Sequence, residues 1–141
     1  MPEIDKVLKV VSEWVLKADN DLKTASHTLE MDDECPTDTV CFHAQQCVEK
    51  YLKALLVLKS IPFPKTHNIE ELIGLLPEDS RPKLADRDQD RLTEYATVTR
   101  YPGDYEPILL AEARRAVRIA RRARTQIRKL LPKQVLPRKR K

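Results

Sequence analysis

The residues best suited to chemistry in this 141-residue chain form a polar stripe between positions 43 and 53. Steps of three, four and three residues place them within an arc of about 80° on one face of a predicted helix, at about 100° per residue. The stripe consists of His43, Gln46, Lys50 and Lys53. Two ammonium groups, an imidazole and an amide on one wall suit an anionic ligand. The alternative is that both lysines are solvated and that His43 makes an ordinary hydrogen bond.

A second candidate is the segment Thr66-His67-Asn68, which precedes a predicted short helix. A helix N-terminus offers unpaired backbone N–H groups and a partial positive charge, so His67 could help to hold a phosphate there. The alternative is that these residues only cap the helix, with Asn68 as the N-cap and Glu71 three residues later.

The most distinctive loop is Arg100-Tyr101-Pro102-Gly103-Asp104. A guanidinium beside a phenol, braced by a proline and a glycine, can bind a phosphate bidentately while Asp104 restrains Arg100. The alternative is an ion pair between Arg100 and Asp104, with Asp104 also acting as an N-cap. We predict that Arg100, Tyr101 and Asp104 belong to a phosphate-binding site.

Several chemistries lack their motifs in this sequence. The chain contains no Gly-rich phosphate loop, no G-x-S-x-G and no H-E-x-x-H. Its three histidines are too scattered to predict a metal site, and we predict no cofactor. Cys35, Cys41 and Cys47 are spaced by six residues, which matches no metal-ligand pattern. We interpret them as small apolar fillers of a reduced protein.

The formal net charge of +4 conceals a strong asymmetry. Residues 114–141 hold thirteen Lys or Arg and no acid, whereas residues 1–113 hold thirteen Lys or Arg and 22 acids. The body is therefore nine charges negative and the C-terminal part thirteen positive. Such a gradient favours self-association, an acidic partner or nucleic acid. The arginine face of the last helix could contact phosphates non-specifically, and the alternative is that this face is only solvated.

Composition and proline placement predict an all-helical protein. Two glycines are too few for the turns of most sheet folds, and the ten prolines separate stretches in which apolar residues recur at steps of three and four. The predicted helices run to about Met31, from about Thr37 to Ser60, over Ile69–Leu76, from about Asp86 to Thr99, and from near Pro107 until before Pro132. Helices of this kind fit one domain, residues 1–132, followed by a basic disordered tail, residues 133–141.

The sequence predicts a cytoplasmic protein that makes no membrane contact. No apolar run approaches the ~20 residues that a membrane-spanning helix needs. The first residues, Met-Pro-Glu-Ile-Asp-Lys, do not have the basic and apolar stretches of a secretory signal.

With these motifs in place, the chain resembles the HEPN domain family from about Trp14 to Leu131. The resemblance rests on four strings in order: Trp14-x3-Ala18-x2-Asp21-Leu22, Cys41-Phe42-His43-Ala44-Gln45-Gln46-x2-Glu49-Lys50-x-Leu52-Lys53-Ala54-Leu55-Leu56, Thr66-His67-Asn68-Ile69-x2-Leu72 and Thr99-Arg100-Tyr101-Pro102-Gly103-Asp104. It implies an antiparallel up-and-down bundle of four to five helices, a homodimer, and often a minimal nucleotidyltransferase as partner in a toxin-antitoxin-like system.

The resemblance also implies which activities are open to this chain. Many HEPN domains are metal-independent ribonucleases whose signature is an Arg, four to six residues and a His, but no histidine follows Arg100 here. The phosphate-binding half of the signature is kept and the proton-transfer half is missing. We therefore favour non-catalytic binding of nucleotide or RNA phosphate. The alternatives are a ribonuclease toxin in which His43 or His67 substitutes, and a purely structural adaptor.

Overall fold

Five α-helices make up most of the computed structural model, which describes residues 2–97 and 107–137. They are α1 (Pro2–Leu29), α2 (Thr37–Leu58), α3 (Ile69–Leu75), α4 (Asp86–Thr97) and α5 (Leu110–Arg128). Three single-turn 3₁₀ helices, η1 (Asp32–Glu34), η2 (Glu78–Ser80) and η3 (Lys133–Val135), lie between or after them. Within these ranges there is no β-strand, so the prediction of an all-helical bundle of four to five helices is confirmed.

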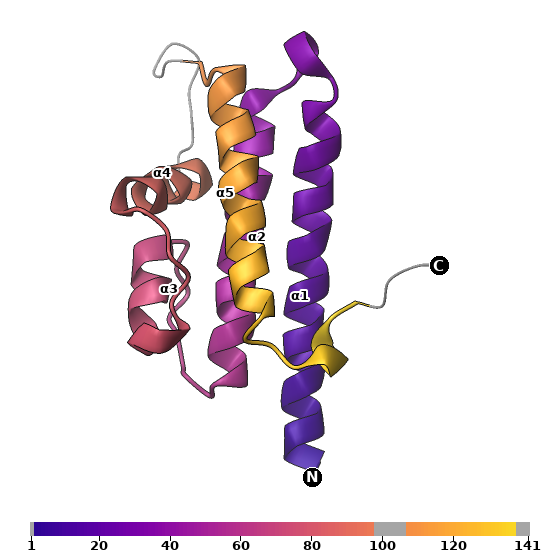
Figure 1. The fold of residues 1–141 in the computed structure, drawn as a ribbon, viewed down its shortest axis with the longest axis vertical. Helices are drawn as coiled ribbons and strands as arrows, with labels where there is room; N and C mark the ends of the chain where they lie inside the picture. The colour runs from indigo at the N-terminus through magenta and orange to yellow at the C-terminus, as the bar shows by residue number, and fades with distance from the viewer. Residues whose placement is uncertain (1, 98–106, 138–141) are drawn as a thin grey trace.

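Helix α2 occupies the centre of the bundle, and each of the other four helices contacts it. In Figure 1, α1 ascends and α2 and α5 descend, so α1 is antiparallel to both. The two short helices α3 and α4 lie on the side of α2 away from α1, with α4 above α3 (Figure 1). Helix α5 runs in the same direction as α2.

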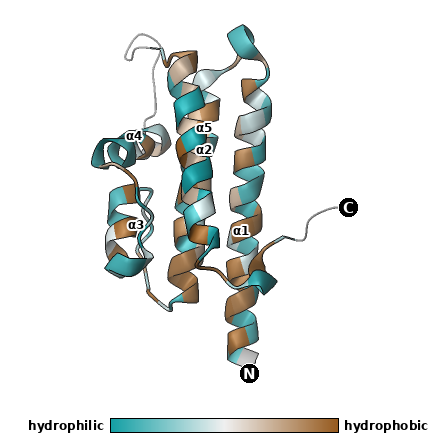
Figure 2. Ribbon diagram, in the orientation of Figure 1, coloured by the Kyte–Doolittle hydropathy of each residue, from teal (hydrophilic) through white to brown (hydrophobic). Residues whose placement is uncertain are grey.

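The burial of each long helix follows its apolar pattern. Helix α2 is covered on most sides, and thirteen of its 22 residues are buried, including the polar Gln45, Glu49 and Lys53. Helices α1 and α5 bury one stripe each and leave a polar face outward, as Figure 2 shows. The buried stripe of α5 is made largely of alanines, which permit a close approach to α2: Ala113, Ala116, Ala120 and Ala123. Cys35, Cys41 and Cys47 are buried in the same core, in agreement with their predicted role as fillers.

The start of α5 differs from the sequence prediction. The sequence places Pro107 in its first turn, but the helix begins at Leu110 because Ile108 is buried and its carbonyl accepts a 2.7 Å hydrogen bond from the Thr37 hydroxyl. Leu109 lies four residues before Ala113 and continues the apolar spacing of this helix, yet it is consequently 72% exposed. Leu130, three residues after Ile127, continues the same spacing and is also exposed.

The tail differs from prediction as well. The sequence predicts disorder from Lys133 onward, yet Lys133–Val135 forms η3, which contacts α1. The reason is that Val135 is an apolar side chain that the structure buries. Residues 138–141 lie outside the described residues.

Two hydrogen bonds fix the short helix α3 in place. Asn68 caps α3 as predicted, since its side-chain oxygen accepts a 2.9 Å hydrogen bond from the backbone N–H of Glu71. The Thr93 hydroxyl on α4 accepts a hydrogen bond from the backbone N–H of Ile69, which joins the two short helices.

None of the helices in the described ranges is both long enough and apolar enough to cross a membrane.

Candidate functional site

The first part of the predicted polar stripe is held by a carboxylate of α1. His43 Nδ1 lies 2.8 Å from one oxygen of Asp21, and Lys50 donates to the other oxygen over 2.6 Å. The Asp21 side chain is only 11% exposed, because α1 and α2 pack along their length. The structure therefore brings His43 and Lys50 together, with a negative charge already between them.

The second part of the stripe surrounds Glu49, whose side chain is 4% exposed. Its oxygens accept from Lys53 over 3.0 Å and from Gln45 over 3.0 Å, and His67 Nδ1 lies 2.8 Å away. Gln46 joins this cluster by donating to the side-chain oxygen of Gln45. Burial alone would raise the pKa of Glu49, but the hydrogen bonds from Gln45, His67 and Lys53 outweigh it, so the pKa lies below its ordinary value.

These two clusters limit what the stripe can offer a ligand. The Lys53 ammonium lies 5.7 Å from the ring centroids of both Trp14 and Phe63, and it is nearly enclosed. His67 is the most accessible member, with 56% of its side chain exposed. The Glu49 carboxylate at Nδ1 fixes the orientation of the His67 imidazole. The stripe is thus a pair of internally compensated polar clusters.

The predicted Arg100, Tyr101 and Asp104 lie outside the described residues, but the helices that precede and follow them enclose a cleft. This α4–α5 cleft has a volume of about 460 Å³. Its apolar floor includes Leu92 and Ile119, both buried. Its polar lining is Arg87, Asp88, Arg91, Tyr95, Glu112 and Arg115. Three arginines against two carboxylates leave one formal positive charge.

The polar groups of the α4–α5 cleft are ordered by contacts between the two helices. Arg115 donates to both oxygens of Asp88, over 3.0 and 3.2 Å. Arg91 and the Tyr95 hydroxyl both donate to Glu112. Burial and the bond to Glu112 raise the pKa of Tyr95, so its hydroxyl stays protonated at neutral pH. Among the described residues no carboxylate pairs with Arg87.

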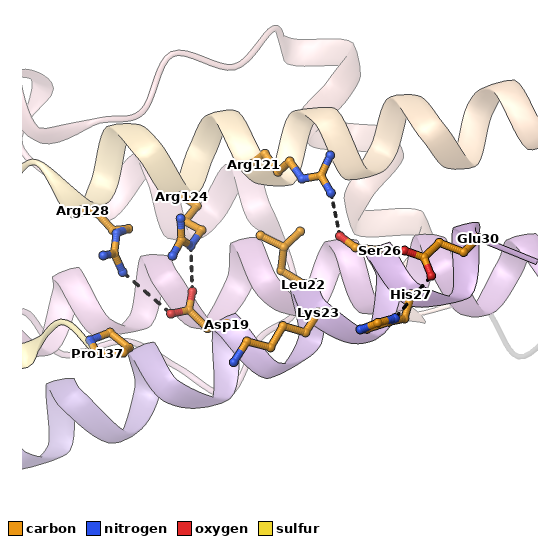
Figure 3. A pocket seen from close by; sticks show the side chains of 10 residues that line it. All are labelled: Asp19, Leu22, Lys23, Ser26, His27, Glu30, Arg121, Arg124, Arg128 and Pro137. Atoms are coloured by element: carbon orange, nitrogen blue, oxygen red, sulfur yellow. Dashed lines mark hydrogen bonds and ion pairs between the residues drawn. The ribbon is translucent and has the colours of Figure 1, made fainter. Parts of the chain in front are cut away.

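A second hollow, the α1–α5 groove, lies on the other side of α5 from the α4–α5 cleft and has a volume of about 510 Å³. Figure 3 shows the side chains that line it. Arg124 donates to Asp19 over 2.8 Å, and Arg128 lies 3.7 Å from the other oxygen of Asp19. The hydroxyl of the buried Tyr51 also donates to Asp19. Arg121 donates instead to the Ser26 hydroxyl over 2.8 Å.

The sequence analysis predicted roles for Lys50 and Lys53 but not for the carboxylates that pair with the cations, Asp19, Asp21 and Glu49. It also gave no specific role to Arg124. A signal exists for Asp21, because it is three residues after Ala18 and four before Ala25, both of which belong to the buried stripe of α1. A carboxylate at that register is buried and needs a cation. The described residues contain no group of three or more His, Cys, Asp or Glu side chains that could hold a metal ion.

Comparison with known proteins identifies the class to which this helical bundle belongs. The family model described as "HEPN domain" matches residues 11–130, so the chain belongs to the HEPN family. TT1696 from Thermus thermophilus is similar in structure, with a TM-score of 0.71, 25% identity, and coverage of 86% of this chain and 98% of that one. ST0689, an archaeal HEPN homologue, gives a TM-score of 0.66 at 25% identity, covering 85% and 96%. No curated protein matches this chain.

Proposed function

We propose that this HEPN protein binds the phosphoryl groups of a nucleotide or of RNA in the α4–α5 cleft and does not cleave them. The observation that carries the proposal is the cleft itself: guanidinium groups and a phenol stand over an apolar floor, between the two helices that flank the segment bearing Arg100. An apolar floor with a few convergent polar groups is the usual form of a small-molecule site. The phosphate-binding roles of Arg100, Tyr101 and Asp104 stay predictions from the sequence, because these residues lie outside the described ranges.

The absence of an imidazole supports binding over cleavage. The three histidines of the chain are His27, His43 and His67, and none of them is among the described residues that line the cleft. His43 and His67 are instead held on Asp21 and Glu49. Transfer of a proton from a ribose 2′-hydroxyl needs a base within hydrogen-bond reach.

The polar stripe on α2 is the second candidate for the same ligand. A phosphate at His43, Gln46, Lys50, Lys53 and His67 would have to displace Asp21 or Glu49 from their cations. Arg87 has no such competitor among the described residues, and this favours the cleft. Membership of the HEPN family supports the further proposal that the protein is a homodimer and works with a minimal nucleotidyltransferase, as a toxin-antitoxin-like pair would.

Isothermal titration calorimetry with ATP, GTP and a short RNA tests the proposal. We expect heat with at least one of these ligands, and a loss of about tenfold in affinity in Arg87→Gln, because a charge-assisted hydrogen bond contributes about 1.5–3 kcal/mol. Arg118→Gln is the matched control, since Arg118 is exposed and lines neither hollow. No heat from folded protein, or equal losses in both variants, would overturn the assignment of the cleft.

A further inference from the structure

The α1–α5 groove is a separate cationic site on the opposite side of α5 from the α4–α5 cleft. Arg115 and Arg124 are nine residues apart, which is about 180° around a helix. Four basic side chains line the groove, and two carboxylates oppose them: Lys23, Arg121, Arg124 and Arg128 against Asp19 and Glu30. The groove therefore has two uncompensated positive charges, and His27 adds a third when protonated.

Asp19 acts as a positioning residue for two of these cations. It is 9% exposed and lies at the base of the groove, between α1 and α5 (Figure 3). It takes the Nε donor of Arg124 and lies against Nη1 of Arg128, and each guanidinium has five N–H donors. Further donors on both residues are therefore available to a ligand, with the side chains already fixed in orientation. The bond to Asp19 raises the pKa of Arg124 against the effect of burial, so the charge is permanent.

Arg121 and Lys23 supply the two positive charges of the groove that no carboxylate in the described part of the chain neutralises. Among the described residues, the Arg121 guanidinium has only the neutral Ser26 hydroxyl as a hydrogen-bond partner, and no carboxylate pairs with Lys23. The remaining acid, Glu30, pairs with His27 at the exposed end of the groove, where solvent screens it.

The cations form a row, not a cluster around one point. At 1.5 Å per residue, Arg121, Arg124 and Arg128 are spread over about 10 Å of the α5 axis. Pro137 lines the same groove. A row of this kind matches a ligand with repeated negative charges better than one with a single phosphate.

The lining also distinguishes between two classes of polyanion. Protein partners are anchored by aromatic or apolar side chains inserted into pockets. The apolar residues of this lining are Leu22, which is buried, and Pro137, and the described residues that line the groove include no Phe, Tyr or Trp. We infer that the α1–α5 groove binds the phosphate backbone of a nucleic acid strand, without reading its sequence.

Fluorescence anisotropy of a labelled 20-nucleotide oligouridine with the full chain tests this inference. The test variant is Lys23→Gln with Arg121→Gln, which leaves the Asp19 contacts intact. Each single-strand phosphate contact contributes a slope of about −0.7 to the dependence of log K on log salt. Loss of two contacts should lower the affinity about 25-fold at 0.1 M salt and reduce the slope by about 1.4.

The control is Arg118→Gln combined with Arg122→Gln, which removes the same charge from exposed positions outside the groove lining. Equal weakening by both double variants would show that only net charge matters and would overturn the inference, as would no binding by the wild type in 50 mM salt. Polyglutamate could bind as tightly as the RNA and lose this binding in the same variant. That result would overturn the inference, because it would identify the ligand of the groove as an acidic protein. ATP affinity should be unchanged in the groove variant, which separates this result from any failure of the α4–α5 cleft.

Discussion

Nδ1 of His43 on α2 lies 2.8 Å from a carboxylate oxygen of Asp21 on α1, and Lys50 donates to the other oxygen of the same carboxylate. One acid of α1 thus fixes two of the four side chains that the sequence indicates as a binding stripe. The interaction is between helices and is largely shielded from water, so it contributes to the stability of the bundle before any ligand is considered.

Asp21→Asn should therefore destabilise the protein. Lys50 and His43 would lose their charged partner at a nearly buried position, and we expect a loss of about 1–2 kcal/mol in the free energy of unfolding. Urea denaturation monitored by circular dichroism measures this loss. Glu30→Gln removes an exposed pair with His27 and should cost less than about 0.5 kcal/mol. Equal losses in the two variants would contradict the structural role of Asp21.

Stability should fall at acid pH because of Glu49. Its pKa is lower in the folded protein than its ordinary value of 4.5, so its contribution is complete above that pH and is lost as the pH falls toward the folded pKa. Glu49→Gln should be less stable than the wild type at pH 7, and the difference should shrink as the pH is lowered from about 5 to about 3. Urea midpoints across this range provide the measurement. A difference that is constant with pH would refute this account of Glu49.

Two apolar residues that share the spacing pattern of α5 should respond very differently to truncation. Ile127 is fully buried, so Ile127→Ala should cost about 2–5 kcal/mol. Leu109 continues the same sequence pattern but is exposed, so Leu109→Ala should change the stability by less than about 0.5 kcal/mol. Thermal melts of the two variants decide the matter, and a large loss from Leu109→Ala would mean that this side chain is covered in solution.

Purified protein should leave labelled RNA intact in the presence of EDTA. The chain has no histidine after Arg100, and the cleft lining contains none among the described residues. Gel analysis of the RNA over several hours is a sufficient measurement. Cleavage that disappears in both Arg100→Ala and His43→Ala would establish the ribonuclease alternative, whereas cleavage unaffected by either change would indicate a contaminant.

Light scattering should give twice the chain mass of 16.3 kDa at micromolar concentration. The expectation follows from the proposal that this HEPN protein is a homodimer. A species of the single-chain mass would contradict it, and a dimer that survives about 0.5 M salt would show that the opposite charges of the two chain halves are not what holds it together.

The helices of this protein could be predicted because the signal for each is local. Spacings of three and four residues between prolines located α1 to α5 within a few residues, and the Asn68 cap followed from two side chains three positions apart. The start of α5 could not be found in this way. Pro107 is favourable in a first helical turn. Burial of Ile108 and a hydroxyl 71 positions earlier in the chain override that preference.

The candidate site was predicted only in part for the same reason. The periodicity of α2 correctly placed His43 and Lys50 near one another, but Asp21 is 22 and 29 residues away from them along the chain. Which carboxylate meets which cation depends on the packing of two helices, and a pattern within one helix does not contain that information. Arg124 and Asp19 are 105 residues apart in the sequence, and their pairing forms a wall of the α1–α5 groove. No local motif predicts this pairing.

The separation of Asp19 and Arg124 along the sequence also determines when the α1–α5 groove can form during translation. Helices α1 and α2 can pair once residues 2–58 have left the ribosome, but the cationic wall of the groove arrives only with residues 121–128. A nascent or prematurely terminated chain therefore exposes Asp19 without its arginines and presents an acidic surface. The capacity that we infer for nucleic acid is therefore acquired only when α5 packs against α1.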